Sequence, residues 1–245
     1  FPGSSLPNAM VQVSPVTKFH SGAGYQYEDS VIYGFTHTNK GHWNLCHIPL
    51  LPVTGTPTPG DYCSPFSHER ESAAPGYYQV FLDRYGVDAQ LSSTLRCAFH
   101  KYTYPAGAAA SLLADLQRSN EHVRAWDIRK EGDNVFAGWQ QTGEKMYFYA
   151  VANRPVTGIE PVVEGDREVR IVRFGEGDGA LELRIGFSFV SEKNARENLE
   201  AEMLGKSFAE VRSEATATWN DLLGRIRVEG GTEREKGLFY SSLYR

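Results

Sequence analysis

The feature that most constrains the fold is a long series of short β-branched and aromatic runs with a period of two residues, from Met10 to about Val190. Glycine, proline and aspartate separate these runs, and helix signals are nearly absent. In the clearest run, residues 94–104, we expect one face to be buried and the other to be partly wet. We expect the other strands at Gly76–Asp83, Val87–Ser92, Ala109–Leu116, His122–Lys130, Val135–Gln141, Lys145–Ala152, Glu168–Phe174 and Leu181–Val190. Nine or more antiparallel strands in one block predict a large β-sandwich.

The pattern changes at Ser191, where helical signals begin. Ser207 with Glu210, and Thr232 with Glu235, have the spacing of capping boxes, which satisfy free amides at a helix start. The second helix reaches Arg245 without a glycine or proline to end it, and we expect it to continue into a further domain. The sequence therefore predicts a sandwich domain over residues 1–190, a helical linker over 191–231, and the start of another domain over 232–245.

Charge and hydropathy exclude several classes of protein. The 25 Lys and Arg residues are outnumbered by 30 Asp and Glu residues, and no basic stripe is present, which argues against a nucleic-acid partner. No apolar run approaches the roughly 20 residues of a membrane span. The first residues lack a signal-peptide pattern, so the sequence leaves the localisation open.

Three cysteines, Cys46, Cys63 and Cys97, form no C-x-x-C pair, which argues against a zinc site. A bridge between Cys46 and Cys63 is one alternative, and three buried or free thiols are the other. With at most one disulfide, the stability of the fold must come from its apolar core.

The common catalytic motifs are absent, namely G-x-S-x-G, the P-loop, H-E-x-x-H and a dinucleotide fingerprint. The unusual segment is Gly34–Pro52, which contains a dense polar cluster. A carbohydrate pocket combines an aromatic platform with directed polar groups, and Trp43 could be that platform, while Gly41 would allow a sharp turn. The alternatives remain open that Trp43 is a core aromatic residue, that the histidines only decorate a loop, and that Lys40 is a solvated surface residue. The cluster consists of His37, Asn39, Lys40, His42, Trp43, Asn44 and His47.

Glycoside cleavage generally needs a pair of carboxylates. The acids nearest the polar cluster are expected to be loop or capping residues, and those after Ser191 are expected on the wet face of a helix. The sequence therefore offers no convincing catalytic pair. The residues concerned are Glu28, Asp29, Asp61 and Glu69 in the first group and Glu192, Glu197, Glu200 and Glu202 in the second.

Several segments, taken in order, resemble one known family. They are FPGSSLPNAMVQVSP, GYQYEDSVIYGFTHT, SFVSEKNARENLEAE, and ATATWNDLLGRIRVEGG followed by FYSSLYR. Together they are similar to the amino-terminal domain of glycoside hydrolase family 92, the calcium-dependent exo-α-mannosidases, and the resemblance runs from Phe1 to Arg245.

This resemblance implies a supersandwich of the galactose-mutarotase type, a helical linker, and then an (α/α)6 barrel that begins near Tyr240. It implies an inverting mannosidase acting on mannose-containing glycans such as N-glycans. It further implies that the catalytic acid and base, and most calcium ligands, lie in the barrel domain, so no catalytic residue and no metal ligand is assigned here. The family's location would be secreted, periplasmic or at the cell surface. Asn194, Asn198 and Glu202 match family residues and are expected to serve the linker.

The resemblance also implies that the loop after GFTH forms one wall of the pocket. Many relatives have GFSHTHLSGTG where this chain has GFTHTNKGHWNL, so His37 matches while the following residues differ. The expected substrate-binding residues are His37, Asn39, Lys40, Gly41, His42 and Trp43. Lys40 and His42 could favour an anionic leaving group such as a mannosyl phosphate diester, although a neutral α-mannoside is the first expectation.

Two alternatives come from other classes of function. The β-domain could act alone as a carbohydrate-binding module, an idea motivated by the aromatic and polar loop and by the absence of paired carboxylates. It could also be a mutarotase-like enzyme, for which His37 with Glu28 is the only pair that the sequence suggests, an idea that rests on analogy of fold alone.

Overall fold

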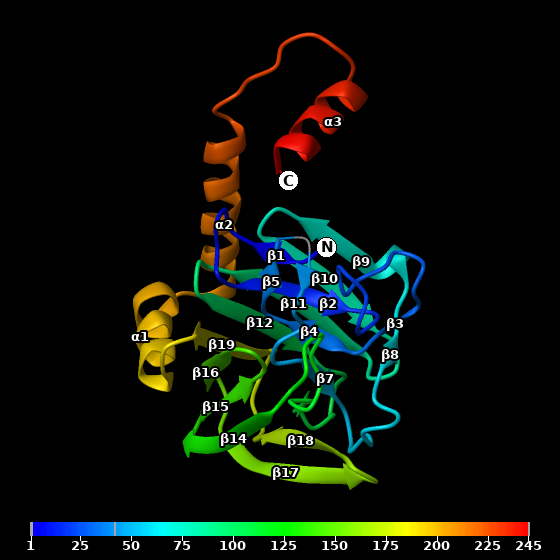
Figure 1. Ribbon diagram of the computed structural model, residues 1–245, viewed down its shortest axis with the longest axis vertical. Helices are drawn as coiled ribbons and strands as arrows, with labels where there is room; N and C mark the ends of the chain where they lie inside the picture. Colours follow the sequence, from blue (N-terminus) through cyan, green and yellow to red (C-terminus); the bar gives the residue numbers. More distant parts are fainter. Residues whose placement is uncertain (1, 42, 245) are drawn as a thin grey trace.

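Two antiparallel sheets face each other across a continuous apolar core in the computed structural model, which describes residues 2–41 and 43–244 (Figure 1). The first sheet has the strand order β1-β2-β4-β7-β13-β18-β17 and the second β14-β15-β16-β19-β12-β11-β10-β9. Two short pairs, β3 with β8 and β5 with β6, lie outside these sheets. The predicted mainly-β sandwich followed by helices is confirmed.

The strands of the first sheet are β1 (Ser4–Ser5), β2 (Gln12–Val16), β4 (Gly34–Thr36), β7 (Leu50–Val53), β13 (Ser111–Ala114), β17 (Val156–Glu164) and β18 (Arg167–Phe174). Those of the second are β9 (Glu71–Ala74), β10 (Tyr77–Leu82), β11 (Val87–Ser93), β12 (Cys97–Thr103), β14 (Ala125–Gly132), β15 (Val135–Gln141), β16 (Lys145–Ala152) and β19 (Leu181–Ser188). The short pairs are β3 (Val31–Ile32) with β8 (Ser64–Pro65), and β5 (Asn39–Lys40) with β6 (Trp43–Asn44); a 3-10 turn, η1, spans His68–Arg70.

The nine expected strands all appear, with ends that shift by up to three residues. β17 was not expected, because its sequence VTGIEPVVE contains a proline and does not alternate regularly. It pairs only with β18 and lies at the sheet edge, which is where a strand tolerates a proline such as Pro161. Its mostly exposed side chains explain the missing pattern, because neither face is fully buried.

The expectation for residues 94–104 is confirmed, because Ala98, His100 and Tyr102 are buried on one face while the other face is partly exposed, at Leu95 and Thr103. Cys97 and Phe99 are completely buried, because they lie under the helices that follow the sandwich, in a second apolar cluster with Leu199 and Phe208. Alternation within one strand cannot show that a distant segment covers its outer face.

Three helices follow the sandwich: α1 (Glu192–Met203), α2 (Phe208–Leu223) and α3 (Glu233–Tyr244). The capping box predicted at Ser207 is present, and the Thr232 hydroxyl accepts the expected bond from the Glu235 backbone amide. Figure 1 shows α1 beside the second sheet and α2 rising past it, while α3 (red) lies above the strands. α2 is fastened by Trp219, whose Nε1 donates to the Ser5 carbonyl at 2.7 Å, whereas α3 has no buried described residue.

The family-like polar residues of α1 have structural partners, as the sequence predicts. Asn198 Nδ2 donates to the Phe187 carbonyl at 2.8 Å. Glu202 accepts hydrogen bonds from Thr94 and from the Arg96 backbone. These contacts hold α1 against the sandwich.

The three cysteines are free thiols, so the Cys46–Cys63 bridge is not formed. Cys46 and Cys97 are buried, and burial raises the pKa of the Cys46 thiol to about 12. Among the described residues, none of the helices is long and apolar enough to span a bilayer.

Candidate functional site

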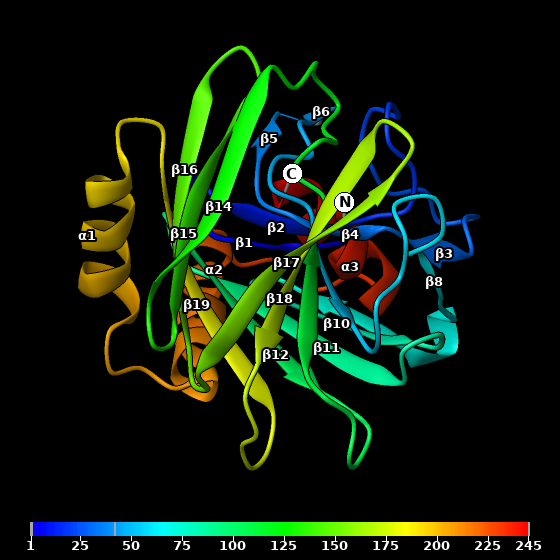
Figure 2. The same cartoon turned by 90° about the horizontal axis from the view of Figure 1, so that it is seen from below.

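The polar cluster of Gly34–Pro52 contains a short hairpin at the end of the sandwich. β5 pairs with β6, so that Asn39 lies opposite Asn44 and Lys40 opposite Trp43. We call residues 39–44 the rim hairpin; His42 lies outside the described residues. Gly41 has φ +59°, a left-handed conformation that glycine adopts without strain, and the predicted sharp turn is therefore present. Figure 2 shows β5 and β6 beside the green loop that leads into β14.

The exposed side of the rim hairpin carries an aromatic ring and a cation. Trp43 is 42% exposed, and its ring lies over Gly22, where an added Cβ would be 3.7 Å from the ring. Lys40 is exposed and forms no ion pair with any described residue. An aromatic surface beside an unpaired cation can stack a sugar ring and attract its polar substituents.

Asn44 fixes the base of the rim hairpin, and its side chain is completely buried. The Asn44 amide oxygen accepts a bond from the Cys46 backbone at 2.8 Å, and the amide nitrogen donates to Thr36 Oγ1 at 3.2 Å. The Asn44 backbone nitrogen donates to the Gly22 carbonyl at 2.8 Å. Asn120 Nδ2 donates to the Asn44 carbonyl at 2.7 Å, so three parts of the chain hold this one residue.

A second contact of Asn120 joins the rim hairpin to a neighbouring loop. Asn120 Oδ1 accepts a bond from the His20 backbone at 2.5 Å. Beside His20, a polar cleft of about 480 Å³ is lined by Lys18 and Arg118 as well as by the candidate acids Glu28 and Asp29. The cleft therefore holds charges of both signs next to the rim hairpin.

His37 lies behind the rim hairpin in the core and is completely buried. Its Nε2 atom is 3.1 Å from Nε2 of His100, and its ring packs on Phe187 with centroids 4.6 Å apart. Burial lowers the pKa of His37 to about 3 and the pKa of His100 well below its usual value, so both rings are neutral at pH 7. In this position the His37 ring is part of the core, beside His100 and Phe187.

Asn39 differs from Asn44 although the two residues face each other. Both polar atoms of the Asn39 side chain are buried and have no hydrogen-bond partner among the described residues. Leaving a buried amide unpaired costs about 1–3 kcal/mol, so buried amides are normally paired. The Asn39 amide is an exception to this rule among the described residues.

A carboxylate lies beside the rim hairpin that the sequence did not suggest. Glu121 Oε2 accepts a bond from Thr142 Oγ1 at 2.7 Å and is 3.3 Å from Nε2 of His47. His47 is buried, and its Nδ1 atom is 2.9 Å from Thr38 Oγ1. Burial lowers the pKa of His47, while Glu121 opposes that shift. No sequence spacing could have joined these residues, because they come from three separate turns.

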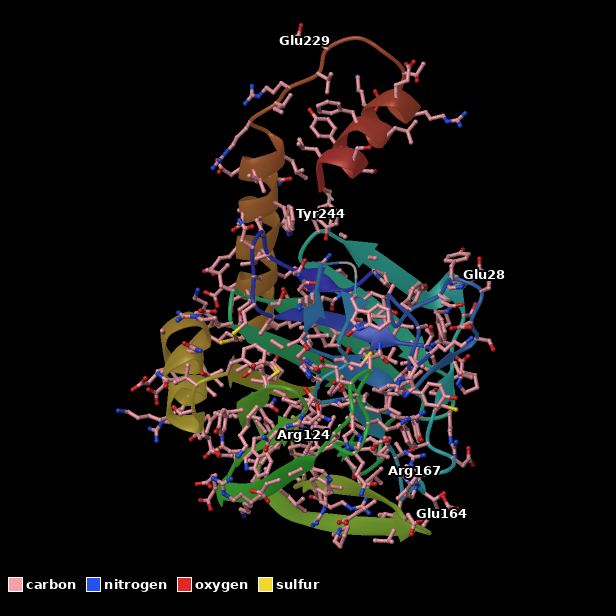
Figure 3. All side chains as sticks on the ribbon, in the orientation of Figure 1. Glu28, Arg124, Glu164, Arg167, Glu229 and Tyr244 are labelled. Carbon is pink, nitrogen blue, oxygen red and sulfur yellow. The ribbon has the colours of Figure 1, made fainter. Side chains whose placement is uncertain are left out.

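The carboxylates named from the sequence are mostly occupied locally. Asp29 accepts a bond from Thr17 Oγ1 at 2.7 Å, Asp61 pairs with Arg84 at 2.7 Å, and Glu69 belongs to the first turn of η1. Glu28 lies at the outer edge of the molecule in Figure 3, and it does not contact His37, whose Nε2 partner is His100. The pair expected for a mutarotase is therefore not assembled from His37 and Glu28.

A calcium ion is held by several oxygen ligands that lie close together. Within residues 2–41 and 43–244, no three His, Cys, Asp or Glu side chains gather as metal ligands. The described carboxylates therefore form no ready-made ligand set for a metal ion.

Comparison with known proteins assigns both parts of the chain to one family. The model described as the glycosyl hydrolase family 92 N-terminal domain matches residues 1–199, and the model of the family 92 catalytic domain matches residues 194–245. A curated relative from Arthroderma benhamiae, named an uncharacterized secreted glycosidase, is 24% identical; the match covers 100% of this chain and 39% of the relative.

Solved structures agree with this assignment. A family 92 α-mannosidase from Bacteroides thetaiotaomicron is 25% identical with a TM-score of 0.90, over 100% of this chain and 38% of that chain. A family 92 inverting mannosidase from the same organism is 24% identical with a TM-score of 0.86, over 100% of this chain and 36% of that chain, and at that identity it shows the fold alone. The chain thus spans less than two-fifths of the length of these relatives.

Proposed function

Because the chain belongs to glycosyl hydrolase family 92, we propose that it is the amino-terminal part of an exo-α-mannosidase and that the rim hairpin forms one wall of the pocket. The family assignment supports a glycosidase, and the name of the similar α-mannosidase supports mannose as the sugar. We also propose that the whole protein acts on mannose-containing glycans outside the cell, which agrees with the word "secreted" in the name of the fungal relative.

The observation that carries this proposal is the exposed side of the rim hairpin on its rigid base. Trp43 offers an apolar surface to the hydrogen-bearing face of a pyranose ring, and Asn39 has an amide that lacks a partner among the described residues. Asn44 holds the backbone beneath both residues through hydrogen bonds. A rigid wall of this kind orients the terminal sugar and excludes water from one side of it.

We propose that the acid and base for glycosidic cleavage lie outside this chain. The match of residues 194–245 to the catalytic-domain model supports a second domain that completes the pocket. An inverting reaction needs an acid at the leaving oxygen and a base that activates water on the opposite face. The part played by residues 1–245 is then binding and orientation of the sugar.

Calcium is part of the proposal for the whole protein. Since the described residues gather no ligand set, most of the oxygen ligands would come from outside this chain. When bound, the ion would polarise sugar hydroxyls as a hard Lewis acid. A chelator is expected to abolish mannose release by the full-length protein.

A second substrate class is favoured by Lys40, which has no acidic partner among the described residues. An unpaired ammonium group at the pocket wall would stabilise a phosphate in the leaving group, as in a mannosyl phosphate diester. A neutral α-mannoside remains the first choice, because the aromatic surface of Trp43 suits any pyranose.

The deciding experiment is mannose release by the full-length protein from neutral α-1,2-mannobiose and from mannose-1-phospho-6-mannose, each with and without chelator. Calcium-dependent release from the neutral disaccharide is expected. Preference for the phosphodiester would instead assign Lys40 to the leaving group. No calcium-dependent release from either substrate would refute the proposed mannosidase, and saturable mannose binding without hydrolysis would favour a carbohydrate-binding module.

A further inference from the structure

Glu121 is a surface carboxylate with an unusually fixed side chain. The side chain is 42% exposed, yet its Oε2 atom is bound to Thr142 Oγ1 and lies near the buried His47 ring. No Lys or Arg among the described residues forms an ion pair with it. A glutamate on a protein surface ordinarily keeps its rotamer freedom, so this one has been ordered in advance of any ligand.

The hydrogen bonds around His47 are consistent with one tautomer. Thr142 donates its hydroxyl proton to Glu121 Oε2, so the Thr142 oxygen is free to accept the proton of His47 Nε2 at 3.0 Å. His47 Nδ1 then accepts from Thr38 Oγ1 at 2.9 Å. With His47 neutral, every donor in this series points toward Glu121, and the series ends on a negative charge.

The series also connects Glu121 to the rim hairpin. Thr38 directly precedes the rim hairpin, and His47 follows it closely along the chain. Asn120, the neighbour of Glu121, holds the Asn44 carbonyl at the base of the rim hairpin. The carboxylate and the rim hairpin are thus held in one fixed arrangement, with Glu121 Oε1 making no hydrogen bond to a described residue.

We propose that Glu121 is a substrate-binding residue that accepts hydrogen bonds from hydroxyl groups of the bound glycan, and that Thr142 and His47 are the residues that position it. This inference rests on the proposed function. While Oε2 stays bound to Thr142, the two lone pairs of Oε1 can accept from neighbouring sugar hydroxyls, and a charged acceptor binds them more strongly than an amide would.

The test is calorimetric titration of the full-length protein with methyl α-mannoside and α-1,2-mannobiose, together with the kinetics of mannobiose hydrolysis. Glu121→Gln is expected to weaken binding and to raise KM by about tenfold, with kcat changed by less than about threefold, because a contact made equally in the ground and transition states acts on KM. Glu144→Gln is the matched control, since Glu144 is an exposed acid on the turn that carries Thr142. It should leave binding and KM unchanged.

Variants of Thr142 distinguish a role in positioning Glu121 from a general role in stability. Thr142→Val removes the hydroxyl but keeps the shape, and it is expected to raise KM by about threefold or more, whereas Thr142→Ser should restore the wild-type value. Thermal unfolding of each variant identifies any loss of fold. The KM values of Thr142→Val, Thr142→Ser and the wild type are compared only between folded proteins.

The outcomes separate this inference from the proposed function. Hydrolysis by the wild type with unchanged binding and KM in Glu121→Gln would overturn the role of Glu121 and leave the mannosidase intact. Binding by the wild type without hydrolysis, with weaker binding in Glu121→Gln, would support the role of Glu121 and refute the mannosidase. Equal effects of Glu121→Gln and Glu144→Gln, or no binding by the wild type, would overturn the inference.

Discussion

The base of the rim hairpin and its exposed side are built in opposite ways. At the base, Asn44 is buried and hydrogen-bonded to Thr36, Gly22 and Asn120 from other parts of the chain, and His47 lies in a series of paired groups. On the exposed side, Trp43 and Lys40 face solvent, while the buried Asn39 amide, opposite Asn44, has no partner among the described residues. The comparison teaches that groups left free for a ligand depend on neighbours whose own bonds are satisfied. Changes at the base should therefore lower stability, while changes on the exposed side should lower activity.

The largest effect is expected from Asn44→Ala. It leaves the Cys46 amide and Thr36 Oγ1 without their side-chain partner and opens a small cavity, so the free energy of unfolding should fall by about 3 kcal/mol. Asn39→Ala, on the opposite residue of the same hairpin, is the matched control. Because the Asn39 amide is buried and unpaired, its removal should not lower the free energy of unfolding. Urea unfolding measures both free energies, and equal losses would show that the paired Asn44 and the unpaired Asn39 contribute alike to stability.

Acidification should also lower the free energy of unfolding, because it protonates the buried histidines behind the rim hairpin. Burial holds the pKa of His37 at about 3, below its ordinary value of 6.5. Between these two pH values the imidazole is protonated in the unfolded chain and neutral in the folded chain. Stability contributed by the neutral ring is complete above pH 6.5 and is lost as the pH falls toward 3. His37 alone should cost about 2 kcal/mol between pH 6.5 and pH 5.

Urea unfolding at several pH values measures how steeply the free energy of unfolding falls with decreasing pH. His37→Gln should flatten it, whereas His122→Gln, at an exposed histidine, should leave it unchanged. A wild-type stability that is constant from pH 7 to pH 5 would contradict a neutral buried pair of His37 and His100.

The exposed side of the rim hairpin could be predicted from sequence, and its base could not. Gly41, Lys40 and Trp43 stand out because their types and spacing predict a turn that carries a ring and a charge. The partners of the base come from distant positions, since Asn120 lies 76 residues from Asn44. Such residues come together only when the whole chain folds, and no local sequence pattern indicates that they are neighbours. The resemblance likewise gives the position of His37 in the sequence but not its burial.

The fold was predicted better than the site, because strand alternation is a local signal and most strands here have one face in the core. The exceptions are instructive. β17 lies at an edge and lacks alternation, and β12 has its outer face covered by α1 and α2. β17 lacks a second neighbouring strand, and β12 has a helical neighbour over part of its outer face, so the burial of each strand differs from simple alternation.

Trp43→Ala should reduce kcat/KM of the full-length protein for α-mannosides by about tenfold, which corresponds to about 1.4 kcal/mol of transition-state binding. The ring is 42% exposed, so the free energy of unfolding should change by less than about 1 kcal/mol. Trp43→Phe keeps an aromatic surface and should retain most of the activity. Unchanged kinetics in Trp43→Ala would place this ring outside the pocket.

The smallest effect is expected from Lys40→Met, which keeps an apolar stem and removes the charge. Since Lys40 is exposed and has no ion pair among the described residues, stability should change by less than about 0.5 kcal/mol. Hydrolysis of the neutral disaccharide should change by less than about twofold, because no full charge develops near an uncharged leaving sugar. Hydrolysis of the mannosyl phosphate diester should fall more, by about threefold, and the ratio of the two rates is the measurement. Added salt should reduce the difference, since the charge is open to solvent. An unchanged ratio would remove Lys40 from leaving-group recognition and would restrict the binding surface of the rim hairpin to Trp43 and Asn39.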